Sequence, residues 1–153
     1  MALSGTTGDK GRLMSQKQVR VGVRVLVWKD GEIALIKREG KYGSGTWAPP
    51  GGHIEFGESA IEAAIRETME EIGVEIKNIK ALGFTEDFSA LYDTHYITIW
   101  IKADWASGRL KSRDMEFTES GFFDINNLPE PLFVSFKNLV DGKLLPKKSY
   151  LTL

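Results

Sequence analysis

Hydrophobic residues near the start of the chain alternate with other residues. Valine occupies every second position from 19 to 27 in the stretch VRVGVRVLVW, and this period of two predicts a strand with one strongly apolar face. The pair Asp30-Gly31 follows, which is preferred in tight hairpin turns. We therefore expect IALIKRE to return beside the first stretch as a second strand.

Later segments continue as strands separated by loops. IKNIKALGFTEDF is expected to form a strand, and HYITIWIKADW alternates again, with isoleucines 97, 99 and 101 on one face. GFFDI predicts a short strand, whereas the glycine- and proline-rich KYGSGTWAPPGG and the polar RLKSRDMEFTES predict loops. Pro131 is expected to open a terminal helix, LFVSFKNLVDG, which Gly142 closes.

These elements predict the fold class and the domain organisation. Strands mixed with two helices, beginning with a hairpin, indicate an α+β sandwich. We expect residues 19–153 to form a single domain. Residues 1–18 are polar and contain several glycines, so we expect them to form a flexible arm.

One predicted helix lies in the stretch GGHIEFGESAIEAAIRETMEEIGV. We expect it to start near Ser59, because prolines and glycines punctuate the chain before that residue. It should end near Gly73, since glycine readily takes the left-handed conformation that ends helices. At the helical period, the expected buried stripe consists of Ile61, Ile65, Thr68 and Ile72.

Three carboxylates fall together on another side of this helix, those of Glu67, Glu70 and Glu71. Each pair of like charges one turn apart costs roughly 0.2–0.5 kcal/mol, and Arg66 offsets part of that cost through Glu62 and Glu70. Hard divalent cations such as Mg²⁺ bind oxygen ligands, and carboxylates supply both ligands and charge. The cluster therefore suggests a metal site, and the alternative is an ordinary solvated acidic face.

Composition narrows the class of protein. The chain has 153 residues, enough for one domain with a core, and 42% hydrophobic and 27% charged residues are ordinary for a soluble globular protein. A net charge of −1 gives no reason to expect nucleic-acid or membrane binding. With no cysteine and two histidines, thiolate and histidine-rich metal centres are excluded. A reducing compartment is permitted, and we expect a cytoplasmic protein.

The glutamate helix and the loop before it resemble the signature of the Nudix hydrolases. That signature is a glycine, five residues, a glutamate, seven residues, then Arg-Glu, an aliphatic residue, any residue, Glu-Glu, any residue, glycine and an apolar residue. Here it runs from Gly52 to Val74, with every charged position filled and with Thr68 where an aliphatic residue is usual. The resemblance implies an α/β/α sandwich with a mixed central sheet, from about Val19 to Gly142.

The strings GSGTWAPPGGHIEFGES and HYITIWIKA are similar to the MutT-like branch of this family, which cleaves nucleoside triphosphates. Family members use water and Mg²⁺ or Mn²⁺. The resemblance makes Glu70 and Glu71 the principal metal ligands, with the backbone carbonyl of Gly51 as a further ligand. Glu67 is a general base or an additional ligand, and Arg66 orients Glu67 or Glu70. Glu70 is also a catalytic candidate, because the resemblance leaves open which glutamate accepts the proton.

Other glutamates each have more than one interpretation. Glu58 assists through the metal shell, secures the loop to the helix, or is an acid favoured by the helix dipole. Glu116, with Glu119 behind it, is the candidate for a metal ligand from a late loop, and the alternative for both is a solvent-exposed role.

Nucleotide recognition requires an aromatic or apolar slot with a few polar edges. Trp47 leads the aromatic candidates because it precedes the signature on a loop. Lys37 and Arg38, at the end of the second predicted strand, are candidates for contacts to phosphates. The candidate substrate-binding residues are Trp47, Gly52, His53, Tyr92, Lys37 and Arg38. Each also has an ordinary structural or solvated interpretation. We expect a small-molecule nucleotide substrate, no nucleic-acid or membrane partner, and a homodimer.

The resemblance predicts hydrolysis of a nucleoside triphosphate, unmodified, oxidised or otherwise altered, to a monophosphate and pyrophosphate. The enzymatic alternative is a dinucleoside polyphosphate or another nucleoside diphosphate derivative, because dinucleoside polyphosphate hydrolases often carry a tyrosine about where Tyr92 lies. ADP-ribose hydrolases usually show a proline some fifteen residues after the signature, and none occurs between Gly73 and Pro129. A non-catalytic nucleotide-binding module is a third alternative, although such modules usually lose glutamates that are present here.

Overall fold

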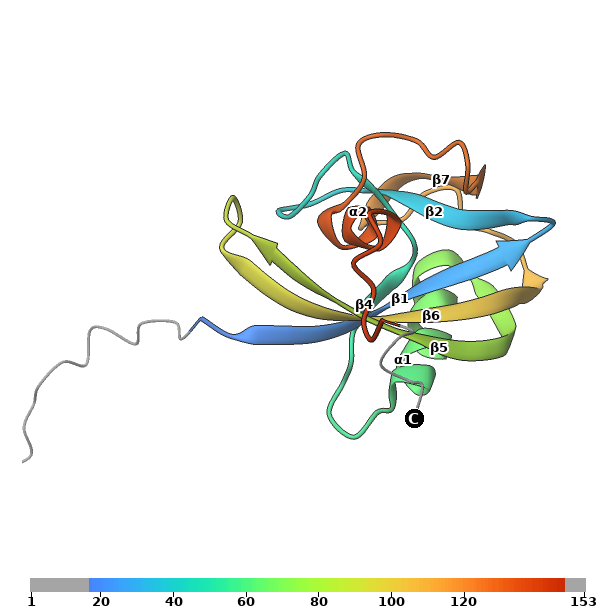
Figure 1. Ribbon diagram of the computed structural model, residues 1–153. Helices are drawn as coiled ribbons and strands as arrows, with labels where there is room; N and C mark the ends of the chain where they lie inside the picture. The colour runs from blue at the N-terminus through green and yellow to red at the C-terminus, as the bar shows by residue number, and fades with distance from the viewer. Residues whose placement is uncertain (1–16, 148–153) are drawn as a thin grey trace, which may run out of the picture.

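The computed structural model describes residues 17–147, in which a mixed sheet carries one helix on each face (Figure 1). The strands are β1 (Val19–Lys29), β2 (Glu32–Arg38), β3 (Trp47–Ala48), β4 (Gly51–His53), β5 (Val74–Ser89), β6 (Thr94–Gly108) and β7 (Phe117–Asp124). The helices are α1 (Ala60–Ile72) and α2 (Val134–Val140). The predicted arm over residues 1–18 lies almost entirely outside the described residues.

The strand order is β3-β2-β1-β6-β5, with β4 paired to β1 and β7 paired to β2. β1 and β6 run parallel, whereas the other paired strands are antiparallel. This mixed sheet between two helices confirms the predicted sandwich fold. Within residues 17–147, no helix is long and apolar enough to cross a membrane.

Each face of the sheet has its own hydrophobic core. Val25 and Val27 of β1 pack in one core with Ile72 of α1. Leu26, between those two valines, belongs to the other core with Phe136 of α2. Because successive side chains of a strand point to opposite faces, the central part of β1 is buried on both sides.

The predicted apolar stripes are partly wrong, because neither is buried along its whole length. Val19 and Val21 are 54% and 42% exposed, since the apolar face of β1 is covered only from Val23 onward. Ile65 on α1 is 47% exposed, whereas Ala64 beside it is fully buried. The helix turns its small side chains towards the sheet, and this allows the two backbones to approach closely.

The boundaries of two expected loops, and that of the terminal helix, differ from the prediction. The expected loop over residues 41–52 contains β3 and β4, because its backbone pairs with β2 and β1. The expected loop over residues 109–120 ends early, since β7 begins at Phe117 and absorbs the predicted short strand. In both places long-range pairing extends regular structure into a segment whose composition favours a loop.

The terminal helix begins at Val134, later than Pro131. The residues between them hydrogen-bond across the chain instead of entering the helix. Trp47 N donates to the Pro131 carbonyl at 2.8 Å, and Phe133 N donates to the Trp47 carbonyl at 2.9 Å. These two bonds hold the segment extended beside β3 and delay the start of α2.

Local signals fix both ends of α1 as predicted. Ser59 is the N-cap: its hydroxyl accepts from Glu62 N at 3.1 Å, and the Glu62 carboxylate accepts from Ser59 N at 2.7 Å. Gly73 closes the helix with φ of 73°, and its amide donates to Met69 O. The helix that carries the glutamates therefore starts and stops at positions set by its own sequence.

Replacing Ser59 by alanine should destabilise the protein by about 1 kcal/mol, because the capping hydroxyl is lost. Thermal denaturation should show a Tm lower by roughly 2–4 °C. Ser59→Thr is the matched control, since threonine keeps the capping hydroxyl, and it should leave Tm nearly unchanged. Equal Tm values for Ser59→Ala and the unsubstituted protein would contradict the role of this cap.

Candidate active site

A cleft of about 580 Å³ lies beside the junction of α1 and the sheet. Its volume falls in the range typical of small-molecule sites. Glu67, Glu71 and Glu116 contribute carboxylates to its lining, and Arg24 and Arg38 contribute guanidinium groups. Strongly charged groups of both signs therefore meet in a single hollow.

Glu71 is a buried carboxylate of the cleft, with only 7% of its surface exposed. Its Oε2 accepts a hydrogen bond from Gly51 N at 2.9 Å, which ties α1 to β4. The pKa of Glu71 is raised to about 7: burial is the main cause, Glu116 and Glu67 add to it, and Arg24 and the Gly51 amide oppose it. Glu71 is thus costly to ionise in the absence of further positive charge.

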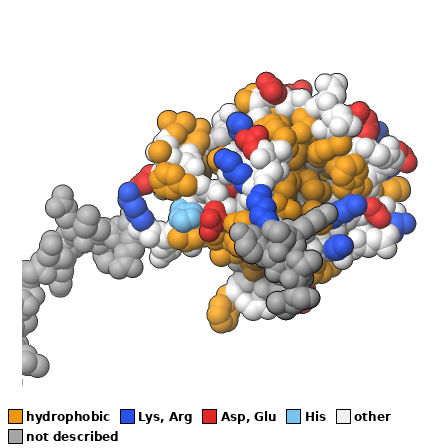
Figure 2. All heavy atoms as spheres, viewed as in Figure 1, with side chains coloured by type: hydrophobic (Ala, Val, Ile, Leu, Met, Phe, Trp, Pro, Cys, Tyr) orange, Lys and Arg blue, Asp and Glu red, His pale blue; other side chains and the backbone are white. Residues whose placement is uncertain are grey.

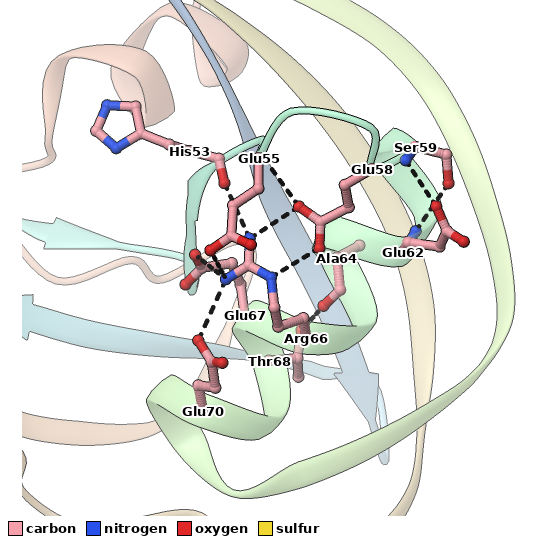
Figure 3. A network of polar contacts seen from close by, with 10 residues as sticks. All are labelled: His53, Glu55, Glu58, Ser59, Glu62, Ala64, Arg66, Glu67, Thr68 and Glu70. Carbon is pink, nitrogen blue, oxygen red and sulfur yellow. Dashed lines mark hydrogen bonds and ion pairs between the residues drawn. The ribbon is translucent and has the colours of Figure 1, made fainter.

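Arg66 connects the glutamates of α1 (Figure 3). It donates to both oxygens of Glu58 at 2.7 and 2.9 Å, which is a bidentate pair. Its Nη1 also donates to Glu67 Oε1 at 2.9 Å and to Glu70 Oε2 at 3.2 Å. A further bond from Nη2 reaches the His53 carbonyl at 3.1 Å. Arg66 therefore fixes the orientation of Glu67 and joins α1 to the end of β4.

Glu58 fastens the loop that precedes α1. Besides its pair with Arg66, its carboxylate accepts from Glu55 N at 3.0 Å. The Arg66 hydrogen bond, with the Glu55 amide, lowers the pKa of Glu58 to about 2. Among the interpretations of Glu58, this geometry favours a link between loop and helix. Glu62, in contrast, contacts the N-cap and not Arg66, although the helical spacing predicted that contact.

Two glycines allow β4 to pass close to its neighbours. A Cβ on Gly52 would lie 2.5 Å from the carboxyl carbon of Glu67, and one on Gly51 would overlap the Val23 carbonyl of β1. Any larger residue at Gly52 must therefore displace Glu67. Glycine is required at both positions for steric reasons, because only the absence of a side chain lets the β4 backbone lie against the acidic residues.

The donor set fits a hard divalent cation. Glu67, Glu71 and Glu116 are carboxylates on one cleft, and the pKa of Glu71 is raised first by burial and then by the neighbouring carboxylates, so a bound cation would favour its ionised form. Glu70 is 62% exposed at its side chain and does not line the cleft, although it shares the Nη1 atom of Arg66 with Glu67. Within residues 17–147, no three acidic or histidine side chains already converge around one point. A role as metal ligand stays a prediction for each of these residues.

Aromatic residues form the rim of the cleft. His53 lines it and lies with Nε2 3.2 Å from the Tyr96 hydroxyl. Tyr92, on the turn between β5 and β6, lines it too and packs edge-on against Tyr42 at 5.7 Å between ring centroids. Figure 2 shows hydrophobic side chains gathered around this end of the hairpin, where Leu91 is 83% exposed.

Two of the candidate substrate-binding residues, Trp47 and Lys37, do not line the cleft. Trp47 is 8% exposed and packs in the core on the α2 side, where its ring meets Phe123 at 5.0 Å, because β3 pairs with β2 and turns the side chain inward. Lys37 pairs with Glu119 at 3.1 Å on the outer part of β2. Arg38, the next residue, points into the cleft, since successive residues of a strand face opposite ways.

Arg24 and Phe133 line the cleft, and sequence reasoning did not single out Arg24 as a site residue. Arg24 is 8% exposed and donates to the Pro49 carbonyl at 2.8 Å. The guanidinium carbons of Arg24 and Arg38 lie 5.2 and 4.2 Å from the centroid of the Phe133 ring. The sequence did contain a signal for Arg24, which is a charged residue in the apolar middle of β1.

Known proteins resemble this chain over most of its length. The NUDIX domain family matches residues 17–141. A protein of Methanocaldococcus jannaschii named ADP-ribose pyrophosphatase is 38% identical over 121 residues, which cover 79% of this chain and 71% of that protein. The putative mutator protein MutT4 of Mycobacterium tuberculosis is 35% identical over 112 residues, which cover 68% of this chain but 43% of MutT4.

A solved structure gives the same picture. The crystal structure of a MutT NUDIX hydrolase from Burkholderia pseudomallei superimposes with a TM-score of 0.76 at 28% identity. The alignment covers 82% of this chain and 98% of that one. The arrangement of sheet, helices and glutamate helix is therefore shared with a MutT protein along nearly its entire length.

The burial of Glu71 predicts a specific pH dependence of stability without metal. Between the unfolded pKa of about 4.5 and the folded pKa of about 7, the folded protein binds more protons at Glu71 than the unfolded chain does. Raising the pH through this window therefore removes stability, on the order of 3 kcal/mol. Glu71→Gln abolishes this contribution, so its stability relative to the unsubstituted protein should rise between pH 5 and pH 8.

Urea denaturation in chelator at the two pH values measures this difference. Glu86→Gln, which replaces an exposed glutamate of β5, is the control and should show no such change. Parallel stability profiles for Glu71→Gln and the unsubstituted protein would show that Glu71 is not the responsible group.

Proposed function

Since the chain belongs to the NUDIX family and is similar to its pyrophosphatases, we propose that it hydrolyses a nucleoside triphosphate to the monophosphate and pyrophosphate. The proposed cofactor is Mg²⁺, with Mn²⁺ as the alternative. The observation that carries the proposal is the cleft in which carboxylates of α1 lie with the guanidinium groups of Arg24, which is buried, and Arg38, which is partly buried.

This arrangement supplies positive charge, which the proposed reaction requires. A triphosphate repels an attacking water unless positive charge compensates its phosphates. Arg24 and Arg38 supply permanent positive charge beside the carboxylates. When bound by Glu67, Glu71 and Glu116, a divalent cation would add charge and lower the pKa of water towards neutrality.

Glu67 is the proposed general base or an additional ligand, and both roles require a carboxylate of fixed orientation. Arg66 holds its Oε1 at 2.9 Å, and Gly52 leaves the carboxyl group the space that it occupies. A side chain restrained in this way loses little freedom when it binds a cation or accepts a proton. Arg66 is a positioning residue in this proposal.

A triphosphate is favoured over other nucleotides by two observations. The chain is similar to MutT proteins in sequence and in structure, and it lacks the proline usual in ADP-ribose hydrolases after the signature. The relative in Methanocaldococcus jannaschii, named ADP-ribose pyrophosphatase, supports a nucleoside diphosphate derivative as the second candidate. Tyr92 at the rim keeps dinucleoside polyphosphates within that second group.

A substrate panel separates these candidates. The panel contains unmodified and oxidised nucleoside triphosphates, diadenosine polyphosphates, ADP-ribose and a nucleotide sugar, each with Mg²⁺ and with chelator. We expect release of pyrophosphate and monophosphate from a triphosphate only when Mg²⁺ is present. Release of AMP from ADP-ribose without turnover of triphosphates would establish the second candidate. Turnover of no compound would contradict catalysis and favour a nucleotide-binding module.

Glu67→Gln should lower kcat by at least about 100-fold, because the side chain keeps its size but loses its charge and basicity. Folding should persist, as judged by circular dichroism. Glu62→Gln is the control on the same helix, since Glu62 contacts only the N-cap and should leave kcat unchanged. Near-normal turnover in Glu67→Gln would remove Glu67 from the proposed mechanism.

A further inference from the structure

The cleft contains a second buried acid, Asp87 on β5, which the proposed hydrolysis does not use. Asp87 lines the cleft although only 2% of its surface is exposed. Aspartate is almost never fully buried unless its charge is paired or hydrogen-bonded. Its position on β5 separates it in the fold from the glutamates of α1.

Hydrogen-bond donors hold the Asp87 carboxylate from three elements. The hydroxyls of Thr98 and Thr85 both donate to Oδ2, at 2.5 and 3.1 Å. Asn138 of α2 donates to Oδ1 at 2.9 Å. The indole of Trp100 donates to Thr85 Oγ1 at 2.9 Å, and this directs the Thr85 hydrogen towards Asp87. Asp87 is therefore a fixed hydrogen-bond acceptor on the wall of the cleft.

These bonds leave the carboxylate able to accept one more. A carboxylate offers about four lone-pair sites, two on each oxygen. Oδ2 receives two donors, whereas Oδ1 receives only Asn138 among the described residues. The structure thus presents an acceptor of known orientation with capacity for a further donor.

An unsatisfied hydroxyl lines the same cleft. Ser135 is 2% exposed, lines the cleft, and its Oγ has no hydrogen-bond partner within residues 17–147. It precedes Asn138 by three residues on α2, so the two side chains lie on the same side of that helix. A buried polar group without a partner costs stability, and a ligand that supplies the partner recovers it.

The remaining walls supply an aromatic surface and positive charge. Phe133, two residues before Ser135, presents a ring that Arg24 and Arg38 flank. Burial lowers the pKa of Arg24, while Glu71, Glu67 and Asp87 each raise it, so Arg24 is within electrostatic range of both acidic parts of the cleft. A ligand with phosphates near α1 can therefore extend past the arginines to Asp87.

We propose that Asp87 reads the nucleobase of the substrate by accepting a hydrogen bond from an exocyclic amino group, with Ser135 as a second polar contact. This inference rests on the proposed function, which assigns the phosphates to the glutamates of α1. Uracil and hypoxanthine carry no exocyclic amino group. Where cytosine and adenine have that group, they have a carbonyl oxygen, which would face the carboxylate. Where guanine has it, hypoxanthine has only C2–H, so Asp87 would lack its donor. The cleft therefore selects amino-bearing bases.

Binding measured without turnover tests the inference independently of catalysis. The ligands are the α,β-methylene triphosphates of adenosine, guanosine, inosine, cytidine and uridine, in which the bond cleaved by the proposed reaction is replaced. Isothermal titration calorimetry of the full chain with Mg²⁺ gives their Kd values. The adenosine or the guanosine analogue should bind at least about tenfold more tightly than the inosine analogue, or the cytidine analogue than the uridine analogue. Equal affinities within all three pairs, or no binding of any analogue, would overturn the inference.

The variant Asp87→Asn tests the residue itself. It keeps the shape but replaces one acceptor oxygen with a donor, so the preference within the selected pair should fall at least tenfold, towards parity. Asp141→Asn is the matched control, because Asp141 at the end of α2 pairs with Lys137 and does not line the cleft. An unchanged preference in folded Asp87→Asn, with only a lowered Tm, would show that Asp87 serves structure alone.

Ser135→Ala provides a second variant if Asp87→Asn does not fold. It should weaken binding of the preferred amino-bearing analogue several-fold and leave the other member of the pair less affected. Absence of triphosphate turnover in the substrate panel, together with a base preference in the binding measurements, would refute the proposed reaction while supporting the role of Asp87. The two ideas therefore fail in distinguishable ways.

Discussion

The carboxylate of Glu71 enters the junction between α1 and the sheet, where it accepts the amide hydrogen of Gly51. Burying this group is expensive, because a carboxylate taken from water loses most of its solvation. The fold places it there together with Arg24 and with further carboxylates, so the local charge is only partly balanced. A divalent cation bound there, as the proposed function requires, would complete that balance, so the packing of helix against sheet and the proposed chemistry would depend on the same carboxylate.

The rest of the site follows from keeping α1 and β4 close together. Gly51 and Gly52 remove the side chains that would separate β4 from β1 and from Glu67. Arg66 then spans the gap, since it binds Glu67 on its own helix and the His53 carbonyl at the end of β4. The same residues thus hold two elements together and orient the carboxylates, which is the kind of preorganisation that polar catalysis requires.

Along the cleft, charge alternates in a way that suits an extended nucleotide. Helix α1 contributes carboxylates, Arg24 and Arg38 flank Phe133, and β5 contributes Asp87. Cations and guanidinium groups suit phosphates, the aromatic ring suits a planar base, and a fixed acceptor suits an amino group. The polarity of the cleft therefore suggests one direction of binding, with the phosphates towards the helix.

The sequence by itself determined the elements whose signals are local. The alternation of β1, the Asp30-Gly31 turn, and the caps of α1 at Ser59 and Gly73 each depend on neighbouring residues, and the structure contains all of them. The spacing of the glutamate signature identified the family for the same reason, because a helix converts fixed spacing into fixed relative position.

Only the tertiary structure decided which side chains share the cleft. Trp47 was drawn into the core by the pairing of β3 with β2, and Arg38 faces the cleft where Lys37 does not. Asp87 and Asn138 meet across 51 positions of sequence, and no local pattern predicts such a contact. Strand register and helix rotation depend on the packing of the whole sheet, so the direction in which each of these side chains points is a property of the assembled fold and not of its own segment.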